Sequence, residues 1–457
     1  MPTRLFWFEK MGGIVLSTNT SKIARYFRFD ELNTNMRTEA AAGITTFLTM
    51  AYILIVNPAI LGNDGGMDFG AVFVATAIAA AIGTLLMGLF ANYPIALAPG
   101  MGLNAYFTYT VVLGMGVPWQ TALGAVFISG VAFLILTATK LRETIINAIP
   151  SGMKHAVSAG IGLFIAFIGL QNVGIIVPDE ATYLALAPDL TEPGILLTVF
   201  GLLVTVLLMV RNVKGAIFFG MILTAIVGMI FGVVEVPKGI VQAPPSLAPT
   251  FLQMDIWAAL ELGLFSIIFA FFFVDLFDTA GTLIGVANQA NLLKGNKLPR
   301  AGRALMADSI ATISGAGLGT STVTSYVEST AGVAAGGRTG MTAVVTACLF
   351  ALSVFFFPII EAFAAVSAIT SPALIIVGVL MAKSLRQIEW HELDEAIPAF
   401  LTMLFMPLAF SIATGIAIGF IVYPLAKIFN GKWKQVHPIV YVLGVIFILR
   451  FVFLGSL

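Results

Sequence analysis

The sequence predicts an all-α polytopic membrane protein with about 14 transmembrane segments, arranged as two inverted repeats of seven. Three observations support this fold class. First, 59% of the 457 residues are hydrophobic and only 10% are charged, with a mean hydropathy of +1.01, which is typical of a chain folded in lipid. Second, apolar runs approach the roughly 20 residues that one crossing needs. Third, Lys and Arg gather between alternate runs.

The apolar runs fall into two sets of seven. The first set lies near 40–62, 70–91, 97–113, 118–139, 153–175, 194–210 and 215–234. The second set lies near 256–286, 304–316, 320–337, 340–360, 365–382, 396–410 and 411–427. We therefore divide the chain into a cytoplasmic N-terminal segment (1–38), a first repeat (39–234), a second repeat (255–428) and an additional C-terminal apolar segment (438–456).

The distribution of positive charge predicts the orientation of the repeats. With these crossings, all of the 23 Lys and Arg residues except Lys238 and Arg450 fall on one side, which the positive-inside rule makes cytoplasmic. The N-terminus lies on the same side, as expected for a multi-pass protein of the cell's inner (cytoplasmic) membrane. Because each half has an odd number of crossings, the second half enters the membrane from the opposite side. The repeats are therefore inverted.

Composition also argues against several functions. The net charge is zero, which gives no reason to expect nucleic acid as a partner. The single cysteine, Cys348, lies in an apolar run and is expected to be buried by packing. His155, His391 and His437 lie apart in sequence at predicted cytoplasmic edges, so we expect no metal site, and no cofactor. No hydrolase or intramembrane protease motif is present, so an enzyme is not expected.

Two segments at corresponding positions of the repeats are interrupted by Gly and Pro. Tyr93–Tyr109 and Gly315–Gly337 each form the third crossing of their half, and Asn104 and Glu328 occupy comparable places within them. Broken backbone at this depth is tolerated where it is buried or lines a cavity, and such half-helices form the substrate sites of transporters. The alternative is that small residues such as Gly332 only permit close helix packing.

Acidic residues at membrane depth mark the predicted site. A carboxylate there costs roughly 2.5–3.5 kcal/mol on insertion scales, so it is expected to face a cavity or a partner. Asp275 and Asp278 lie three residues apart on one helix face, and either is a candidate for the main ligand. Glu328 lies in the second broken segment. Asp308, in the ninth crossing, is a candidate for a structural partner or for a proton relay.

The residues around these acids indicate the chemistry of a ligand. There is almost no cation at membrane depth, which favours a neutral polar solute or a cation over an anion. Glu328 can accept hydrogen bonds from N–H groups, whereas Asn104 and Thr324 can both donate and accept. Tyr326 and Phe107 offer aromatic faces, although such rings in lipid are more often packing surfaces. Together these groups suggest a flat heterocycle rich in hydrogen-bond donors.

Four long motifs resemble the AzgA-like purine permeases of the nucleobase cation symporter group. They are NTNMRTEAAAGITTFLTMAYILIVNPAIL at 33–61, APGMGLNAYFTYTVV at 98–112, FFFVDLFDTAGTLIGVA at 271–287 and GTSTVTSYVESTAGVAAGGRTGMTAVVTA at 319–347. The resemblance implies a uracil-permease-like fold, with a core domain from crossings 1–4 and 8–11 and a gate domain from crossings 5–7 and 12–14. It also implies proton-coupled uptake of purine nucleobases, with hypoxanthine and guanine favoured over adenine, and a possible homodimer.

The resemblance assigns expected roles to particular residues. The family's carboxylates fall on Asp275 and Glu328, and its third-crossing amide falls on Asn104, preceded by Gly102. With Phe107, Thr324 and Tyr326, which are candidates through their own chemistry, the expected substrate-binding residues are Asp275, Glu328, Asn104, Gly102, Phe107, Thr324 and Tyr326. The expected proton-coupling residues are Asp275, Asp278, Glu328 and Asp308. An adenine-selective symporter, a sodium-coupled transporter and an anion transporter of the same fold remain alternatives.

Overall fold

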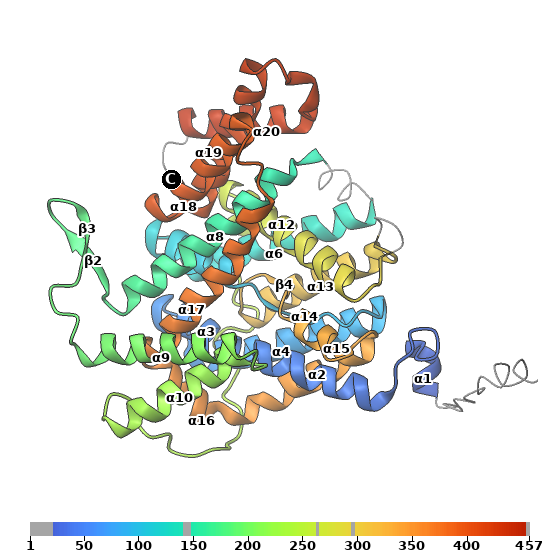
Figure 1. Ribbon diagram of the computed structural model, residues 1–457, viewed down its shortest axis with the longest axis vertical. Helices are drawn as coiled ribbons and strands as arrows, with labels where there is room; N and C mark the ends of the chain where they lie inside the picture. The colour runs from blue at the N-terminus through green and yellow to red at the C-terminus, as the bar shows by residue number, and fades with distance from the viewer. Residues whose placement is uncertain (1–21, 140–147, 262–264, 294–297, 454–457) are drawn as a thin grey trace, which may run out of the picture.

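The computed structural model describes residues 22–139, 148–261, 265–293 and 298–453, and Figure 1 shows the path of the chain. Residues 1–21 of the predicted N-terminal segment and 454–456 of the predicted C-terminal segment lie outside the described residues. Nine helices of the described chain are long and apolar enough to cross a membrane, and two shorter apolar helices cover Ala216–Ile230 and Pro438–Leu449. The expected helical, multi-span architecture is confirmed.

The helices follow the predicted apolar runs closely. The first half of the chain forms α1 (Lys22–Phe27), α2 (Met36–Met50), α3 (Ile53–Pro58), η1 (Ala59–Asp64), α4 (Phe69–Leu86), η2 (Met87–Ala91), α5 (Met101–Ala105), η3 (Tyr106–Gly114), α6 (Trp119–Ala138), α8 (Ser151–Asn172), α9 (Pro193–Val210) and α10 (Ala216–Ile230). The second half forms α11 (Ile256–Ala259), α12 (Phe265–Gln289), α13 (Ala301–Leu318), α14 (Ser329–Ala334), α15 (Gly340–Ser353), η5 (Val354–Phe356), α16 (Phe357–Ala364), α17 (Ser367–Met381), η6 (Ala382–Gln387), α18 (Leu393–Leu408), α19 (Ile412–Phe429), η7 (Trp433–Gln435) and α20 (Pro438–Phe453).

Polar side chains start several of these helices. Asn35 accepts a hydrogen bond from the backbone N–H of Thr38 at the start of α2, and Asp68 accepts one from Ala71 at the start of α4. Ser411 accepts one from Thr414 at the start of α19. Such caps satisfy backbone donors that the first turn leaves unpaired. Short polar residues therefore fix where these three helices begin.

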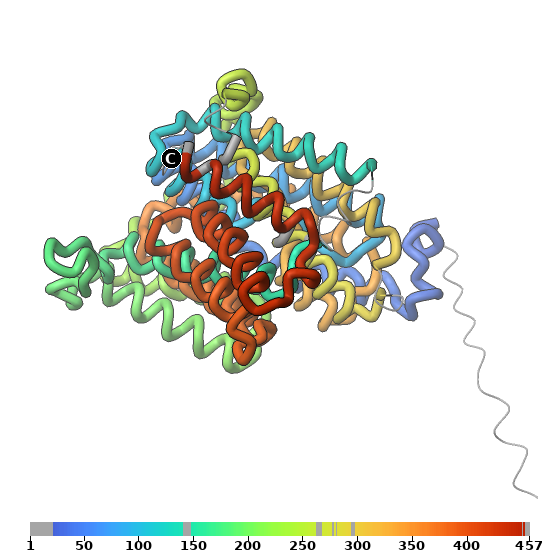
Figure 2. Tube along the Cα trace, turned by 90° about the horizontal axis from the view of Figure 1, so that it is seen from above, coloured from blue at the N-terminus to red at the C-terminus, as the bar shows by residue number. Residues whose placement is uncertain are grey.

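The helices pack into two groups. In the first, which we call the strand-bearing bundle, α15 packs on α2 and α4, α13 packs on α4 and α6, and α12 packs on α6. In the second, the flanking bundle, α8 packs on α17 and α18, α9 packs on α10 and α17, and α18 packs on α19. Helix α20 packs on α19, and Figure 2 shows these two C-terminal helices in red. The bundles meet where α12 and α5 contact α8.

Within this helical architecture the two broken segments contain short β-strands, which the sequence analysis did not predict. β1 (Leu97–Pro99) pairs with β4 (Val323–Ser325) in antiparallel register, with Ala98 opposite Thr324. Backbone bonds extend the pairing on both sides, from Gly100 N to Thr322 O (2.9 Å) and from Tyr326 N to Ala96 O (3.0 Å). Strand pairing satisfies the backbone groups that the interrupted helices expose at membrane depth. A second ribbon joins β2 (Ile176–Asp179) and β3 (Tyr183–Leu186).

A threonine of the preceding helix holds each central strand. Thr84, on α4, donates to the carbonyl of Leu97 in β1 (2.9 Å). Thr312, on α13, donates to the carbonyl of Val323 in β4 (3.0 Å). In the predicted repeats α4 and α13 are each the second crossing of their half, so the two halves anchor their strands in the same way.

One sequence expectation about packing is wrong. Cys348 lies on α15 but is exposed rather than buried. Its side chain points away from the faces of α15 that carry the buried residues Thr342, Thr346 and Phe350. In a lipid-embedded helix an apolar sequence run does not distinguish the bundle face from the lipid face, since both are apolar.

Candidate functional site

The candidate site is built around the β1–β4 crossing. Helix α5 starts directly after β1, and α14 starts four residues after β4, so each broken segment is a strand followed by a short helix. Helix α12 passes the same place, because it contacts β4, α14 and α5. The predicted carboxylates on α12 and before α14 are therefore brought to one region of the strand-bearing bundle.

Glu328 immediately precedes α14 and is held by the first span. The hydroxyl of Tyr52, which lies between α2 and α3 and is fully buried, donates to Oε1 of Glu328 (2.8 Å). Thr49 also approaches the Glu328 carbonyl (3.4 Å). These contacts fix the position of the carboxylate at the end of the strand crossing. Tyr52 is a site residue that the sequence analysis missed; its signal was a phenolic hydroxyl within the apolar run 40–62.

The two aspartates of α12 have different neighbours. Oδ2 of Asp278 accepts a hydrogen bond from the hydroxyl of Thr324 in β4 (3.2 Å), so Asp278 faces the strand crossing and the Glu328 side. Asp275 is fully buried, and its Oδ1 lies 3.2 Å from the hydroxyl oxygen of Thr279, one turn further along α12. Asp275 and Asp278 can have different neighbours because side chains three residues apart on a helix point about 60° apart.

Thr279 joins Asp275 to Asp308. Its hydroxyl oxygen lies 2.9 Å from Oδ1 of Asp308 on α13 as well as 3.2 Å from Asp275, and all three side chains are fully buried. A hydroxyl has one proton to donate, so it can bond to both carboxyls only if one of them is protonated and donates to it. The arrangement is therefore suited to hold a proton between two carboxyls. Thr279 was not predicted as a site residue.

Asn104 lies on α5, where its side chain is fully buried. Its Oδ1 accepts a hydrogen bond from the hydroxyl of Ser321, which lies just before β4. Among the described residues its Nδ2 has no hydrogen-bond partner, and neither do the hydroxyl oxygens of Thr322 and Ser325. Buried polar atoms are normally paired with protein or water, so three such atoms beside one strand crossing are candidate ligand contacts.

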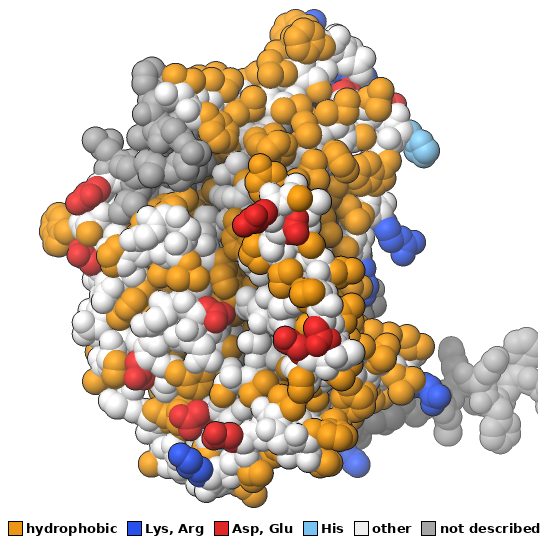
Figure 3. Space-filling model, turned by 90° about the vertical axis from the view of Figure 1, so that its left-hand side faces the viewer, with side chains coloured by type: hydrophobic (Ala, Val, Ile, Leu, Met, Phe, Trp, Pro, Cys, Tyr) orange, Lys and Arg blue, Asp and Glu red, His pale blue; other side chains and the backbone are white. Residues whose placement is uncertain are grey.

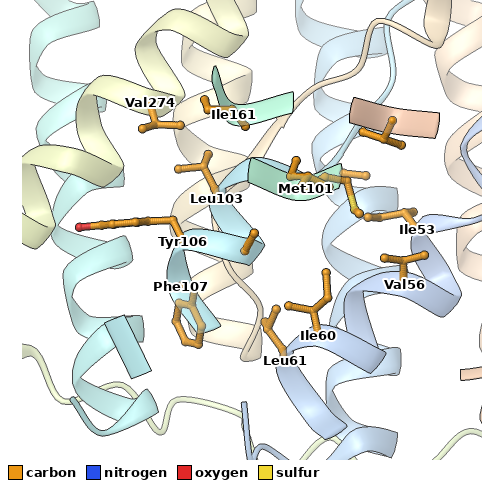
Figure 4. Close-up of a cluster of buried hydrophobic side chains, with 14 of the residues drawn as sticks. Ile53, Val56, Ile60, Leu61, Met101, Leu103, Tyr106, Phe107, Ile161 and Val274 are labelled. Carbon is orange, nitrogen blue, oxygen red and sulfur yellow. The ribbon is translucent and has the colours of Figure 1, made fainter. Parts of the chain in front are cut away.

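The other predicted binding residues have structural contacts as well. The Tyr326 hydroxyl donates to the Pro99 carbonyl, which ties β4 to β1. Phe107 packs near Phe271 (6.3 Å between ring centroids) and lies in a buried apolar cluster (Figure 4). A Cβ on Gly102 would lie 2.4 Å from Cγ2 of Ile161, so this glycine lets α5 approach α8 of the flanking bundle. Substrate contact by these three residues remains a prediction.

Residues 37–418 match the Permease family (Xan_ur_permease). The chain is 56% identical to guanine/hypoxanthine permease PbuG of Bacillus subtilis, covering 94% of this chain and 99% of that protein. It is 45% identical to adenine permease AdeP of Escherichia coli, covering 95% and 97% respectively.

Solved structures share the fold at low identity. The transmembrane domain of the cyanobacterial bicarbonate transporter BicA superposes with a TM-score of 0.62 at 16% identity, covering 84% of this chain and 97% of that one. Murine Solute Carrier 26 family member A9, an anion transporter in the inward-facing state, gives a TM-score of 0.62 at 9% identity, covering 92% and 74%.

The family match and these relatives identify a multi-pass membrane transporter rather than an enzyme. The chain belongs to the Permease family, and the resemblance to AzgA-like purine permeases that its motifs indicated is confirmed by these relatives.

Proposed function

We propose that this protein imports purine nucleobases, hypoxanthine and guanine in preference to adenine, by proton symport across the cytoplasmic membrane. The observation that carries the proposal is Glu328, a carboxylate held by Tyr52 at the end of the strand crossing with Asp278 facing the same crossing. Relatives named as guanine/hypoxanthine permeases are 56%, 50% and 35% identical to this chain, and the adenine permeases AdeP and AdeQ are 45% and 43% identical. The order of preference is supported by the first two of these relatives, which are more similar to this chain than either adenine permease.

The site's polar groups match a neutral purine. Glu328 accepts a hydrogen bond from a ring N–H and, for guanine, from the exocyclic amine. The Nδ2 group of Asn104 donates to a ring acceptor or to the 6-oxo group. A carboxylate of α12 accepts from the imidazole N–H. In this conformation Asp278 is the α12 carboxylate that faces β4, which favours it for this contact; the expectation from resemblance favours Asp275.

Proton coupling is assigned to the acids around α12. Asp275, Thr279 and Asp308 form a buried chain that leads from the site towards the N-terminal part of α13. Two carboxyls at low dielectric oppose each other's ionisation, so a proton is readily held there. Its inward movement releases about 2.3 kcal/mol per 100 mV of membrane potential, which drives the neutral base uphill.

Alternating access follows from the two bundles. We infer that the chain has fourteen segments in two inverted repeats, with its N-terminus in the cytoplasm. The strand-bearing bundle is the core domain and the flanking bundle is the gate domain, and rocking of one against the other exposes the site to each side in turn. A homodimer through the flanking bundle is an expectation from the family resemblance.

Uptake of radiolabelled hypoxanthine by cells lacking their own purine permeases tests the proposal. Saturable uptake that guanine blocks, that persists without sodium and that collapses with a protonophore is the expected result. Block by adenine but not by guanine moves the assignment to an adenine permease. Uptake that requires sodium overturns the proton coupling, and no uptake of any base overturns the substrate class.

The roles of the two aspartates are tested by matched Asp275→Asn and Asp278→Asn variants. The substrate-contacting carboxylate is the one whose loss weakens hypoxanthine binding by the purified protein. The proton carrier is the one whose loss leaves binding intact but abolishes accumulation against a gradient. If Asp278→Asn binds hypoxanthine with wild-type affinity, Asp278 does not contact the base.

A further inference from the structure

A polar cavity lies apart from the strand crossing. It has a volume of about 290 Å³, close to the lower end of the roughly 300–1,000 Å³ of small-molecule pockets. Its walls come from α3–η1, the end of α8, and α16–α17. Among the described residues that line it, Asn63, Asp64, Asn172 and Ser367 are polar, and Val56, Ile60 and Leu374 are apolar. None of the predicted substrate-binding residues lines it.

The cavity is on the predicted outer side of the membrane. Asn63 and Asp64 end the first span, Asn172 ends the fifth, and residues 364–367 join the eleventh to the twelfth; by the positive-inside orientation all three places are outside. Asn63, Asp64 and Asn172 are exposed. Figure 3 views the face of the molecule that carries β2 and β3, and acidic side chains are scattered over it with few basic ones.

The cavity lies between the two bundles, because α3 and η1 pack on α4 of the strand-bearing bundle, whereas Asn172 and Leu374 belong to α8 and α17 of the flanking bundle. The Tyr109 hydroxyl, on η3, donates to Oδ2 of Asp64 (2.6 Å) and accepts from Nδ2 of Asn172 on α8 (2.8 Å). Nδ2 of Asn63 donates to the carbonyl of Ala364 (3.0 Å). The polar wall of the cavity is therefore an ordered hydrogen-bonded set. It is placed at the boundary that must move if the bundles rock.

An apolar wall separates this cavity from the strand crossing. Val56 and Ile60 line the cavity and also belong to the buried cluster that surrounds α5, together with Met101 and Leu103 (Figure 4). Met101 and Leu103 lie on α5 shortly before Asn104 in the sequence, so this apolar cluster extends from the cavity wall to the helix that carries Asn104.

We propose that this cavity is an outer nucleobase site, which takes up the base before it passes the Val56–Ile60 wall. The inference rests on the proposed function and adds a second site to it. Asp64 accepts an N–H of the base, and Asn63 and Asn172 donate and accept at its edges. Val56, Ile60 and Leu374 cover an apolar ring face. No Lys or Arg is among the lining residues, so the site selects neutral or donor-rich solutes over anions.

Cysteine protection tests this site directly. In a Cys348→Ala background, Ser367→Cys places a thiol in the cavity wall, where a membrane-impermeant maleimide reaches it from outside. The Glu328→Ala substitution in the same protein removes the central carboxylate. Hypoxanthine is expected to slow labelling at position 367 in this protein. Adding Asp64→Asn is expected to raise the hypoxanthine concentration that gives half-maximal protection about tenfold, which corresponds to the loss of a hydrogen bond to a charged group.

Glu361 provides the matched control position. It is exposed on α16, close in sequence to the cavity residues but outside its lining. A thiol introduced by Glu361→Cys should be labelled at the same rate with and without hypoxanthine. If hypoxanthine protects position 367 only when Glu328 is present, the protection reports binding at the central site. The outer site would then be rejected. Wild-type hypoxanthine uptake with no protection at 367 rejects the outer site alone, whereas no uptake and no protection by any base rejects the proposed function with it.

Discussion

The hydroxyl of Tyr52 lies 2.8 Å from Oε1 of Glu328, although the two residues are 276 positions apart in the sequence. This bond joins the first span to the start of α14, and it is made by a residue at the interruption between α2 and α3. The first span therefore helps to set the position of the carboxylate on which the proposed substrate contact depends.

Replacing Tyr52 by Phe removes that bond and keeps the ring. Since a hydrogen bond to a charged group contributes about 1.5–3 kcal/mol, we expect Tyr52→Phe to raise the KM for hypoxanthine about tenfold or more. Initial uptake rates over a range of base concentrations measure this. Tyr441→Phe, on α20, is the control, because its hydroxyl bonds to the backbone of Trp433 far from the site. Equal KM values for wild type and Tyr52→Phe would show that the bond does not position Glu328 for binding.

Glu39 is a buried carboxylate that locks α2 to the start of α15. Its two oxygens accept hydrogen bonds from the hydroxyls of Thr34 (2.8 Å) and Thr342 (2.6 Å). They also accept from the backbone N–H groups of Arg338, Thr339 and Thr342, at 3.0, 3.3 and 3.2 Å. A carboxylate at a helix N-terminus is further stabilised by the helix dipole.

The substitution Glu39→Gln replaces one carboxylate oxygen by an NH2 group, which cannot accept hydrogen bonds from these donors. We expect a loss of at least about 2 kcal/mol of stability, seen as a lower Tm of the detergent-solubilised protein. Glu31→Gln is the comparison, since the Glu31 carboxylate is exposed and its pairing with Arg28 is at the surface. An exposed pair contributes about 0–1 kcal/mol. A Tm shift no larger for Glu39→Gln than for Glu31→Gln would contradict the assigned role.

Gly332 allows α14 to lie against α2. A Cβ at this position would be 2.0 Å from the hydroxyl oxygen of Thr46 and 2.8 Å from the carbonyl oxygen of Ala42. Because the second of these atoms is backbone, Gly332→Ala must push α14 away, at a cost of about 1–3 kcal/mol. Thermal unfolding and hypoxanthine uptake should both be impaired. Gly194→Ala on α9 is the control, because a Cβ there would meet no atom within 4 Å, and it should change neither stability nor uptake. If the Gly332→Ala protein were unimpaired, α14 and α2 would not be in close contact.

Lys427 neutralises two acids at the base of the α18–α19 pair. Its Nζ lies 3.0 Å from Asp394 and 2.8 Å from Glu395, and its side chain is only 5% exposed. Removing one partner of a buried ion pair typically costs about 3–5 kcal/mol, so we expect Lys427→Met to lower the Tm strongly. Lys434→Met removes an exposed charge of the same type and should have little effect. Asp394 keeps Lys432 at 3.2 Å, so Glu395 is the acid that Lys427→Met leaves without a cation among the ion pairs of the described residues. Restoration of the Tm in a Lys427→Met/Glu395→Gln protein would confirm that uncompensated negative charge is the cause.

Much of the fold could be predicted from the sequence, because apolar length and the placement of Lys and Arg depend directly on the bilayer. The interruptions at 93–109 and 315–337 were predicted as well, from Gly and Pro at membrane depth. The strands within them were not. Three residues such as Leu97–Pro99 are too few to show the alternation of a strand, and the pairing partner lies more than 220 residues away.

The carboxylates of the candidate site could be predicted from the sequence, because a charged group in lipid is energetically costly and is rarely present without a role. Carboxylates such as Glu328 and Asp278 are conspicuous in an apolar run, and the structure brings both to β4 and α14. Hydroxyls such as those of Tyr52 and Thr279 are common in spans, where they usually bond to their own helix, so their cross-helix contacts needed the structure.

The β1–β4 crossing is made by backbone hydrogen bonds, and its anchors Thr84 and Thr312 also bind backbone carbonyls. Side chains at positions 98, 324 and 325 are therefore not required to hold the strands together. If the site binds a base as proposed, substitutions there would change which base is recognised while the scaffold that presents the site is retained. The proposed specificity could then diversify by exchange of single side chains, without rebuilding the membrane-spanning architecture.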